Sequence, residues 1–226
     1  GVSVLDQLDE SAVWFEVGAG TGALAEKVLL RLQALDKLPA QYWILEPSAD
    51  LRERQQQRLK SALAPEVFAR CVWLDTPPEE VWQGVMVANE VIDALPTTRF
   101  IIDEGEVYEE CVALDDNQNF RRVMCPADGM VAGAVRHIEK NLDRLFLDGY
   151  CSEVLPQLPY WIQAVAGTMQ KGAMLFVDYG YARDEYYLPE RDDGTLLCYF
   201  RHRAHDDYFV WPGLQDITAS VDFTAL

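Results

Sequence analysis

Three alternating glycines, Gly18, Gly20 and Gly22, come directly after an apolar run that contains one acidic residue, Glu16. Glycine is needed in such a turn because the backbone takes φ values that other residues rarely adopt, and because a ligand must approach bare backbone. A second apolar run ends in Glu46, whose carboxylate can accept hydrogen bonds from both hydroxyls of a ribose. These residue types and spacings indicate a site for a nucleoside-bearing cofactor.

The glycines alone do not identify that cofactor, because their G-x-G-x-x-A spacing also satisfies the relaxed fingerprint of dinucleotide-binding folds. Two details favour S-adenosylmethionine over NAD. Glu16 lies inside the expected first strand, where a dinucleotide fold usually keeps an apolar residue, and an acid there can orient the loop and the cofactor's amino group. Gly22 extends the series to E-x-G-x-G-x-G, which resembles motif I of the class I methyltransferases. The alternative is a glycine turn in an ordinary α/β protein, and the acid after the second apolar run argues against it.

Apolar periodicity predicts the elements that position these residues. Five short apolar runs are expected to be strands, at about residues 13–17, 41–46, 67–74, 84–89 and 173–177. Helical patterns follow the first two strands, and Ser48 or Asp50 can cap the second helix, which runs to about residue 63. Alternating strands and helices predict an α/β fold with a mostly parallel, doubly wound, Rossmann-like sheet. Ligands bind such sheets at the carboxyl ends of the strands, where Glu46, Asp75 and Asn89 all fall.

The chain is expected to divide into four stretches. Residues 1–99 would form the cofactor-binding core, and residues 100–152 an inserted β-meander and helix on the substrate or partner side. The helix of that insert is expected at about 131–147. Residues 153–181 would return to the core as a helix, at about 153–170, and the fifth strand. Residues 182–226 are polar and aromatic with little regular periodicity, which predicts a substrate-side segment.

Composition argues against several classes of function. The chain carries 37 acidic and 19 basic residues, a formal charge of −18, so it would repel phosphate backbones and is not expected to bind nucleic acid. No apolar run approaches the roughly 20 residues of a membrane helix, and no targeting segment is visible. Five widely spaced cysteines without a C-x-x-C pair indicate a reducing compartment. His202 and His205 lack a third ligand at a dependable spacing, so no metal site is expected.

Longer strings make a family resemblance specific. Asn89-Glu90-Val91-Ile92-Asp93-Ala94-Leu95-Pro96 stands where methyltransferases place motif IV. Together with the glycine loop, Glu46-Pro47-Ser48, Asp178-Tyr179-Gly180-Tyr181, Gly194-Thr195-Leu196 and the stretches 201–207, 212–218 and 221–224, it resembles the MidA family. That family comprises the mitochondrial complex I assembly methyltransferases and their bacterial relatives. The resemblance covers essentially the whole chain. A class I methyltransferase sheet normally has more strands than the five expected here, and family members carry more chain at both ends, so the chain is expected to be truncated at both.

The resemblance implies S-adenosyl-L-methionine as cofactor and protein-arginine methylation, of a complex I subunit in mitochondrial relatives. The residues that it implies for cofactor binding are Glu16, Gly18, Ala19, Gly20, Thr21, Gly22, Glu46, Pro47, Ser48, Leu74, Asp75 and Asn89. The residues that it implies beside the transferred methyl are Asn89, Glu90 and Asp93. The expected substrate-side residues are Asp178, Tyr179, Tyr181, His205 and Asp206. A bacterial member would be cytoplasmic, and a eukaryotic one would lie in the mitochondrial matrix.

Arginine stays protonated at neutral pH, so an enzyme that methylates it must grip and orient a guanidinium cation. The carboxylates of Glu90 and Asp93 are suited to this, although Asp93 could equally cap the turn that follows it. Tyr179 and Tyr181 could contact arginine through cation–π interactions or could be core aromatics. Two other functions stay open: methylation of a small molecule or another residue type, and a cofactor-binding assembly factor that acts mainly by protein contact. A homodimer is also left open.

Overall fold

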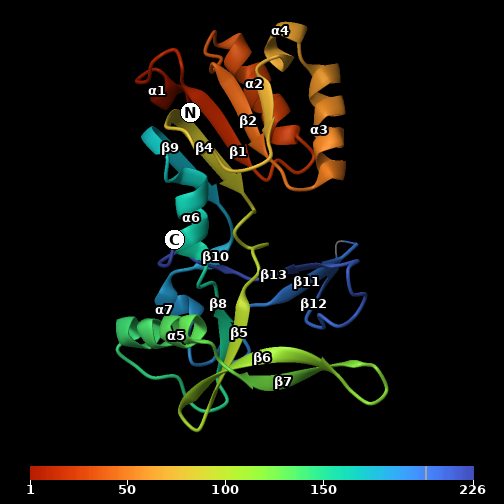
Figure 1. The fold of residues 1–226 in the computed structure, drawn as a ribbon, viewed down its shortest axis with the longest axis vertical. Helices are drawn as coiled ribbons and strands as arrows, with labels where there is room; N and C mark the ends of the chain where they lie inside the picture. Colours follow the sequence, from red (N-terminus) through yellow and green to blue (C-terminus); the bar gives the residue numbers. More distant parts are fainter. Residues whose placement is uncertain (202) are drawn as a thin grey trace. The chain divides into compact units, whose positions relative to one another are not determined.

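The computed structural model describes residues 1–201 and 203–226, so His202 of the predicted histidine pair lies outside the described residues. The chain forms two compact units (Figure 1). The first unit comprises residues 1–91 and 160–178, and the second comprises residues 92–159 and 179–226.

A five-stranded parallel sheet is the centre of the first unit. Its strands are β1 (Val13–Val17), β2 (Gln41–Leu45), β3 (Cys71–Leu74), β4 (Trp82–Asn89) and β9 (Met169–Val177). They lie in the order β3-β2-β1-β4-β9, and every neighbouring pair is parallel. Sequence order reverses at β1 and β4, which confirms the predicted doubly wound α/β fold.

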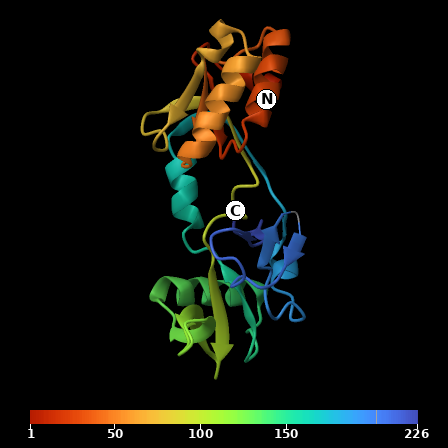
Figure 2. The same ribbon diagram turned by 90° about the vertical axis from the view of Figure 1, so that its right-hand side faces the viewer.

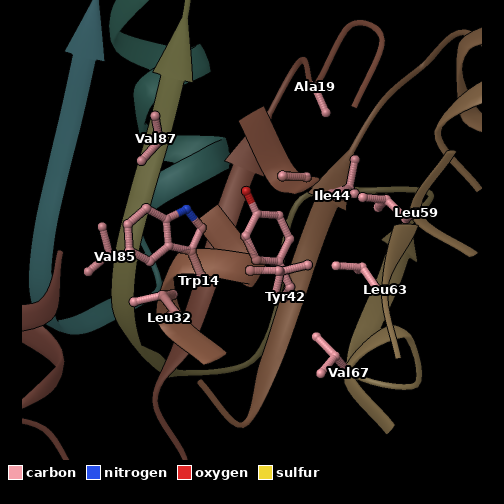
Figure 3. Packing of buried hydrophobic residues seen from close by; sticks show 12 residues of the cluster. Trp14, Ala19, Leu32, Tyr42, Ile44, Leu59, Leu63, Val67, Val85 and Val87 are labelled. Carbon is pink, nitrogen blue, oxygen red and sulfur yellow. The ribbon is translucent and has the colours of Figure 1, made fainter. Parts of the chain in front are cut away.

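Helices α2 (Ala23–Ala34) and α3 (Ala49–Ala62) lie side by side on one face of this sheet (Figure 2). Because side chains alternate along a strand, Trp14 of β1 points to this face while Phe15 points to the other. Trp14 stacks on Tyr42 with ring centroids 6.3 Å apart, and Leu59 of α3 belongs to the same cluster (Figure 3). The opposite face packs against α6 (Leu158–Ala166). Two short helices, α1 (Val2–Leu5) and α4 (Pro65–Phe68), complete this unit.

The second unit contains an antiparallel sheet in the order β7-β6-β5-β8. Its strands are β5 (Thr98–Asp103), β6 (Glu106–Leu114), β7 (Phe120–Pro126) and β8 (Cys151–Val154), and helix α5 (Gly129–Leu142) packs against them. The first three strands confirm the predicted β-meander. The described helices include none long and apolar enough for a membrane crossing.

The tail of the chain is more regular than its sequence indicates. Helix α7 (Arg183–Tyr186) precedes a small antiparallel sheet of β11 (Leu197–Phe200), β12 (Arg203–His205) and β13 (Asp216–Thr218). Strands β10 (Gly180–Tyr181) and β14 (Val221–Asp222) pair in parallel. The short strands leave too few residues for a period of two to be recognised.

Three predicted boundaries are wrong. The third strand begins at Cys71 rather than at residue 67, because Pro65 starts the short helix α4. The helix expected over 131–147 ends at Leu142, where Asp143 takes a left-handed φ of 51°. The helix expected over 153–170 is in fact three elements: β8, then α6, then the start of β9 at Met169. Strand β8 is buried along its whole length, and a short buried strand cannot be told from a helix by periodicity.

Candidate functional site

Four of the predicted residues stand at the carboxyl ends of the parallel strands. Gly18 follows β1, Glu46 follows β2, Asp75 follows β3, and Asn89 is the last residue of β4. These strands are neighbours with matched register, so their ends share one edge of the sheet. The structure therefore brings these residues to the edge where such folds bind ligands.

The glycine loop leaves its backbone open at one position. Gly18, Gly20 and Gly22 all have left-handed φ values, of 66°, 51° and 75°. A Cβ on Gly18 would come within 2.8 Å of Val91 Cγ2, whereas a Cβ on Gly20 would meet nothing within 4 Å. Gly22 is the N-cap of α2, and its N–H donates to Ala19 O at 2.8 Å. A ligand could therefore reach the bare backbone at Gly20, next to the N-terminus of α2.

The carboxylate of Glu46 is buried and held on one side by the start of α3. Its Oε1 accepts a hydrogen bond from the N–H of Ser48 at 3.0 Å. The Ser48 hydroxyl caps α3 by accepting from Leu51 N at 3.3 Å, which confirms that Ser48 starts this helix. Pro47, between them, is exposed. The sequence Glu46-Pro47-Ser48 therefore connects the end of β2 to the N-cap of α3, and the bond from Ser48 N–H holds the Glu46 carboxylate at this connection.

Gln55 is a site residue that the sequence analysis missed. Its Nε2 donates to Gly20 O at 2.9 Å and to Glu46 Oε2 at 3.1 Å, and its Oε1 accepts from Trp73 Nε1 at 3.0 Å. The side chain is fully buried. It lies in a run of polar residues, Arg-Gln-Gln-Gln-Arg, in which nothing but its helical phase toward the sheet distinguishes it from its neighbours. Gln55 joins the glycine loop to the Glu46 carboxylate.

Glu16 is buried on the same face of the sheet as α2 and α3. It accepts a hydrogen bond from the Tyr42 hydroxyl at 2.6 Å between Oη and Oε2. Burial raises the pKa of Glu16, and the hydrogen bond from Tyr42 opposes this shift with a smaller effect. The predicted role of Glu16 toward the cofactor's amino group stays a prediction.

Asp75 follows β3, the outermost strand of the parallel sheet, and is exposed to solvent. Its side chain is 85% exposed, and Oδ1 lies 2.6 Å from Nη1 of Arg52 on α3. Leu74, the last residue of β3, is half-buried, whereas Thr21 of the glycine loop is exposed and Ala19 is buried. An exposed ion pair of this kind contributes little to folding stability, so Asp75 is available to a ligand without loss of the fold.

Glu90 has an unusual backbone conformation. It follows β4 with a φ of 50°, a left-handed value that is uncommon for a residue with a side chain. Its N–H donates to Val177 O, the last residue of β9, at 2.8 Å. This bond places Glu90 and Asp178 after two paired strands, with Asn89 exposed beside them. The structure therefore brings these three predicted residues to neighbouring strand ends of the first unit.

The remaining predicted residues belong to the second unit. Asp93 is 6% exposed, and its Oδ2 accepts a hydrogen bond from the Tyr179 hydroxyl at 2.6 Å. Burial raises the pKa of Tyr179, and the bond to Asp93 raises it further. Asp93 and Tyr179 are thus brought together, although 86 positions separate them. Since Glu90 belongs to the first unit, a joint grip by Glu90 and Asp93 stays a prediction.

Tyr181 and His205 have partners that the sequence analysis did not expect. The guanidinium carbon of Arg191 lies 4.1 Å from the ring centroid of Tyr181, so an arginine of the chain itself contacts this ring. His205 lies edge-on to Trp211 at 5.9 Å, and the next residue, Asp206, is exposed. The described residues contain no group of three or more metal-ligating side chains.

Comparison with known proteins adds a family and three relatives. The family described as "Putative S-adenosyl-L-methionine-dependent methyltransferase" matches residues 2–226. A crystal structure of an uncharacterized protein from Burkholderia thailandensis is 38% identical with a TM-score of 0.88, over 99% of this chain and 58% of that one. A second structure from the same organism, bound to S-adenosyl-homocysteine, is 39% identical with a TM-score of 0.86, over 98% of this chain and 56% of that one.

The curated relative is named "Protein arginine methyltransferase NDUFAF7, mitochondrial" and comes from Danio rerio. It is 31% identical over 157 residues, which are 66% of this chain and 33% of the relative. The chain thus spans about a third of the length of that relative, and less than three fifths of each of the two solved structures.

Proposed function

The chain belongs to this family of S-adenosyl-L-methionine-dependent methyltransferases, and we propose that the whole protein uses the cofactor to methylate arginine in a protein. The observation that carries the proposal is the link made by Gln55 between the Gly20 carbonyl and the Glu46 carboxylate. This link holds the Glu46 carboxylate in place near the open backbone at Gly20, at the carboxyl ends of the strands. A carboxylate and accessible backbone are the two features that a nucleoside-bearing ligand requires.

The residues present fit S-adenosyl-L-methionine. The open backbone at Gly20 would hold the methionine part, because a side chain is absent there and the loop leads into the N-terminus of α2. Glu46 would hold the ribose: a carboxylate has about four acceptor positions, and the bonds from Ser48 and Gln55 leave some of them for two hydroxyls. The edge formed by Leu74 and Asp75 would hold the adenine region. When bound, the cofactor supplies an activated methyl group on a sulfonium.

The acceptor side of the reaction needs groups that bind and orient a guanidinium cation. Glu90 and Asp178 offer carboxylates after the paired strands β4 and β9. Carboxylates of this kind accept two hydrogen bonds from one guanidinium, which fixes the direction of the nitrogen that is methylated. Asp93, with Tyr179 donating to it, would provide a further acceptor, and it could take the proton that the methylated nitrogen releases. Tyr181 and His205 would line the approach of the peptide.

Two observations support arginine over other acceptors. The curated relative is named as a protein arginine methyltransferase, and the net charge of −18 favours a cationic substrate. By the same reasoning the partner would be a protein with an exposed arginine rather than a nucleic acid. By likeness to the mitochondrial relative, a eukaryotic member would act in the mitochondrial matrix and a bacterial one in the cytoplasm.

The test is transfer of labelled methyl from S-adenosyl-L-methionine by the whole protein into lysate proteins from cells that lack the gene. Mass spectrometry of the labelled proteins then identifies the modified residue. Label on arginine that disappears with Glu46→Ala would support the proposal. Label on lysine, or label confined to the small-molecule fraction, would overturn the assignment of the substrate and leave the cofactor assignment intact.

A further inference from the structure

Arg99 is a buried side chain at the centre of a cluster of ion pairs in the second unit. Its side chain, on β5, is 9% exposed and contacts three carboxylates: Glu110 at 3.0 Å, Glu153 at 2.5 Å and Asp193 at 2.5 Å. These acids come from β6, from β8 and from the stretch before β11. One guanidinium therefore joins three segments that are distant in the sequence, and all its donors face acceptors.

The carboxylate of Glu153 extends this cluster toward the tail. While Oε1 contacts Arg99, Oε2 accepts from the backbone N–H of Thr195 at 2.8 Å and from its hydroxyl at 3.2 Å. Glu153 is completely enclosed, and a side chain on Gly194 would collide with its carboxylate. Burial raises the pKa of Glu153, and the positive charge of Arg99 opposes that shift. Arg99, Glu153 and Thr195 are called the Arg99–Thr195 link below.

The link ends on a backbone segment that holds Asp93, which is predicted to lie beside the transferred methyl, and Tyr179, which is predicted to lie on the substrate side. Residues 219–221 donate three consecutive backbone N–H groups, to Asp93 O at 3.1 Å, to Thr195 Oγ1 at 3.0 Å and to Tyr179 O at 3.0 Å. The Tyr179 hydroxyl in turn donates to the Asp93 carboxylate at 2.6 Å. The position of this segment therefore decides how Asp93 and Tyr179 meet.

We propose that Arg99, Glu153 and Thr195 are positioning residues for methyl transfer, which act through residues 219–221 on Asp93 and Tyr179. The inference rests on the proposed function, in which Asp93 and Tyr179 face the substrate arginine. A buried carboxylate that is satisfied on both oxygens is a rigid support, because moving it would leave charged groups unpaired. A small displacement of a group that positions the substrate slows the reaction by a large factor. A rigid support behind Asp93 and Tyr179 would therefore affect the rate of methyl transfer.

Thr195 offers the sharpest test, because one hydroxyl makes the last bond of the link. Thr195→Val preserves the shape of the side chain and the backbone bond to Glu153, but removes the acceptor of the Ser220 N–H together with the hydroxyl's bonds to Glu153 Oε2 and to the Tyr186 hydroxyl. Thr195→Ser retains the hydroxyl. Glu139→Gln is the matched control: Glu139 is a buried acid of the same unit, on α5, with contacts to Arg136 and the N–H of Phe146 and none to the link.

Two readouts on the whole protein separate the inference from the proposed function. Hydrogen exchange measures protection of the amides of residues 219–221 without any substrate. The initial rate of labelled methyl transfer into lysate proteins, at saturating S-adenosyl-L-methionine, measures positioning. For Thr195→Val we expect exchange to be faster by about tenfold or more and methyl transfer slower by about tenfold or more. The affinity for S-adenosyl-homocysteine should stay within about twofold of wild type.

Thr195→Ser should restore both the exchange rate and the methyl-transfer rate. Glu139→Gln should change neither rate, even if it lowers the melting temperature as much as Thr195→Val does. Equal rate losses in Thr195→Val and Glu139→Gln would show that only global stability matters and would overturn the inference. Faster exchange at 219–221 with an unchanged rate would overturn it as well, because the link would then position nothing of catalytic importance. A wild-type protein that labels no arginine would defeat the proposed function, while the exchange data would still report whether the link holds the segment.

Discussion

Gln55 donates from its Nε2 to the Glu46 carboxylate at 3.1 Å, and the same nitrogen lies 2.9 Å from Gly20 O. A buried amide on helix α3 thus sets the distance between the glycine loop after β1 and the acid after β2. These are the two places at which the methionine part and the ribose of the cofactor would be held. The geometry of the proposed cofactor site therefore depends on a residue that need not touch the cofactor.

Replacement of Gln55 by Leu should weaken cofactor binding and destabilise the fold together. The Gly20 carbonyl and the Trp73 indole N–H would lose their partner in a partly buried setting, at up to about 1–3 kcal/mol for each unsatisfied group. The Glu46 carboxylate would also lose one of the two hydrogen bonds that fix its orientation. Thermal unfolding and calorimetric titration with S-adenosyl-homocysteine measure both effects. Gln57→Leu, two positions along α3 and exposed, is the control. Wild-type affinity in Gln55→Leu would mean that the loop and Glu46 are positioned independently.

Replacement of Glu46 by Ala should abolish most of the cofactor affinity while the protein stays folded. The change removes a charged acceptor for two ribose hydroxyls, worth about 2–4 kcal/mol for charge-assisted hydrogen bonds. Calorimetry with S-adenosyl-L-methionine and S-adenosyl-homocysteine checks the loss. Glu53→Ala, on the exposed side of α3, should bind as wild type does. NAD should neither bind nor raise the melting temperature, because a ligand stabilises a fold only by binding its native state. Unchanged affinity in Glu46→Ala would place the nucleoside elsewhere.

The sequence predicts that Gly18 and Glu46 stand directly after strands, as they do in the structure, because these signals are local. A glycine that needs a positive φ, such as Gly20, and an acid that ends a strand, such as Glu46, are recognisable from a few neighbouring residues. Gln55 and Arg99 are not, since their importance comes from partners that are far away in the chain. The same reason explains why strand β8 was missed: Cys151–Val154 is a strand because it pairs with Thr98–Ile101, more than 40 positions earlier. Pairing over that distance leaves no mark on local periodicity.

Tyr42→Phe should destabilise the protein more at pH 8 than at pH 5. Burial raises the pKa of Glu16 above its ordinary value of 4.5, so the folded protein binds a proton more tightly than the unfolded chain. Stability contributed by this proton is present at low pH and is lost as the pH rises from 4.5 through the folded-state pKa. The Tyr42 hydroxyl lowers that pKa, so its removal extends the loss to higher pH.

Urea unfolding of the wild type, Tyr42→Phe and Tyr42→Phe/Glu16→Gln at several pH values measures this effect. The double variant has no carboxyl at position 16 and should lose the extra pH dependence, whatever its absolute stability. A Tyr42→Phe protein whose loss of stability is the same at pH 5 and pH 8 would show that Glu16 does not titrate in this range.

The left-handed backbone of Glu90 allows its proposed role in catalysis to be separated from its role in the fold. A residue with a Cβ at a φ of 50° carries strain of about 1–2 kcal/mol relative to the right-handed region, and glycine carries none. Glu90→Gly should therefore be more stable than Glu90→Ala, by up to about 1 kcal/mol after the greater freedom of glycine in the unfolded chain is counted. Thermal unfolding of the two variants tests this difference. If Glu90 grips the substrate guanidinium, both variants should lose methyl transfer.

Glu90→Gln isolates the charge, because it preserves the shape of the side chain and the strained backbone. Binding of S-adenosyl-homocysteine should stay near wild type, since Gly20 and Glu46 are unchanged. Methyl transfer to arginine should nevertheless fall by about a hundredfold or more, the usual scale for the loss of one preorganised charge contact in a transition state. Wild-type turnover by Glu90→Gln would remove this residue from the acceptor site. An inactive Glu90→Gln protein that still restores the phenotype of cells lacking the gene would show that the protein acts there by contact with a partner, not by methylation.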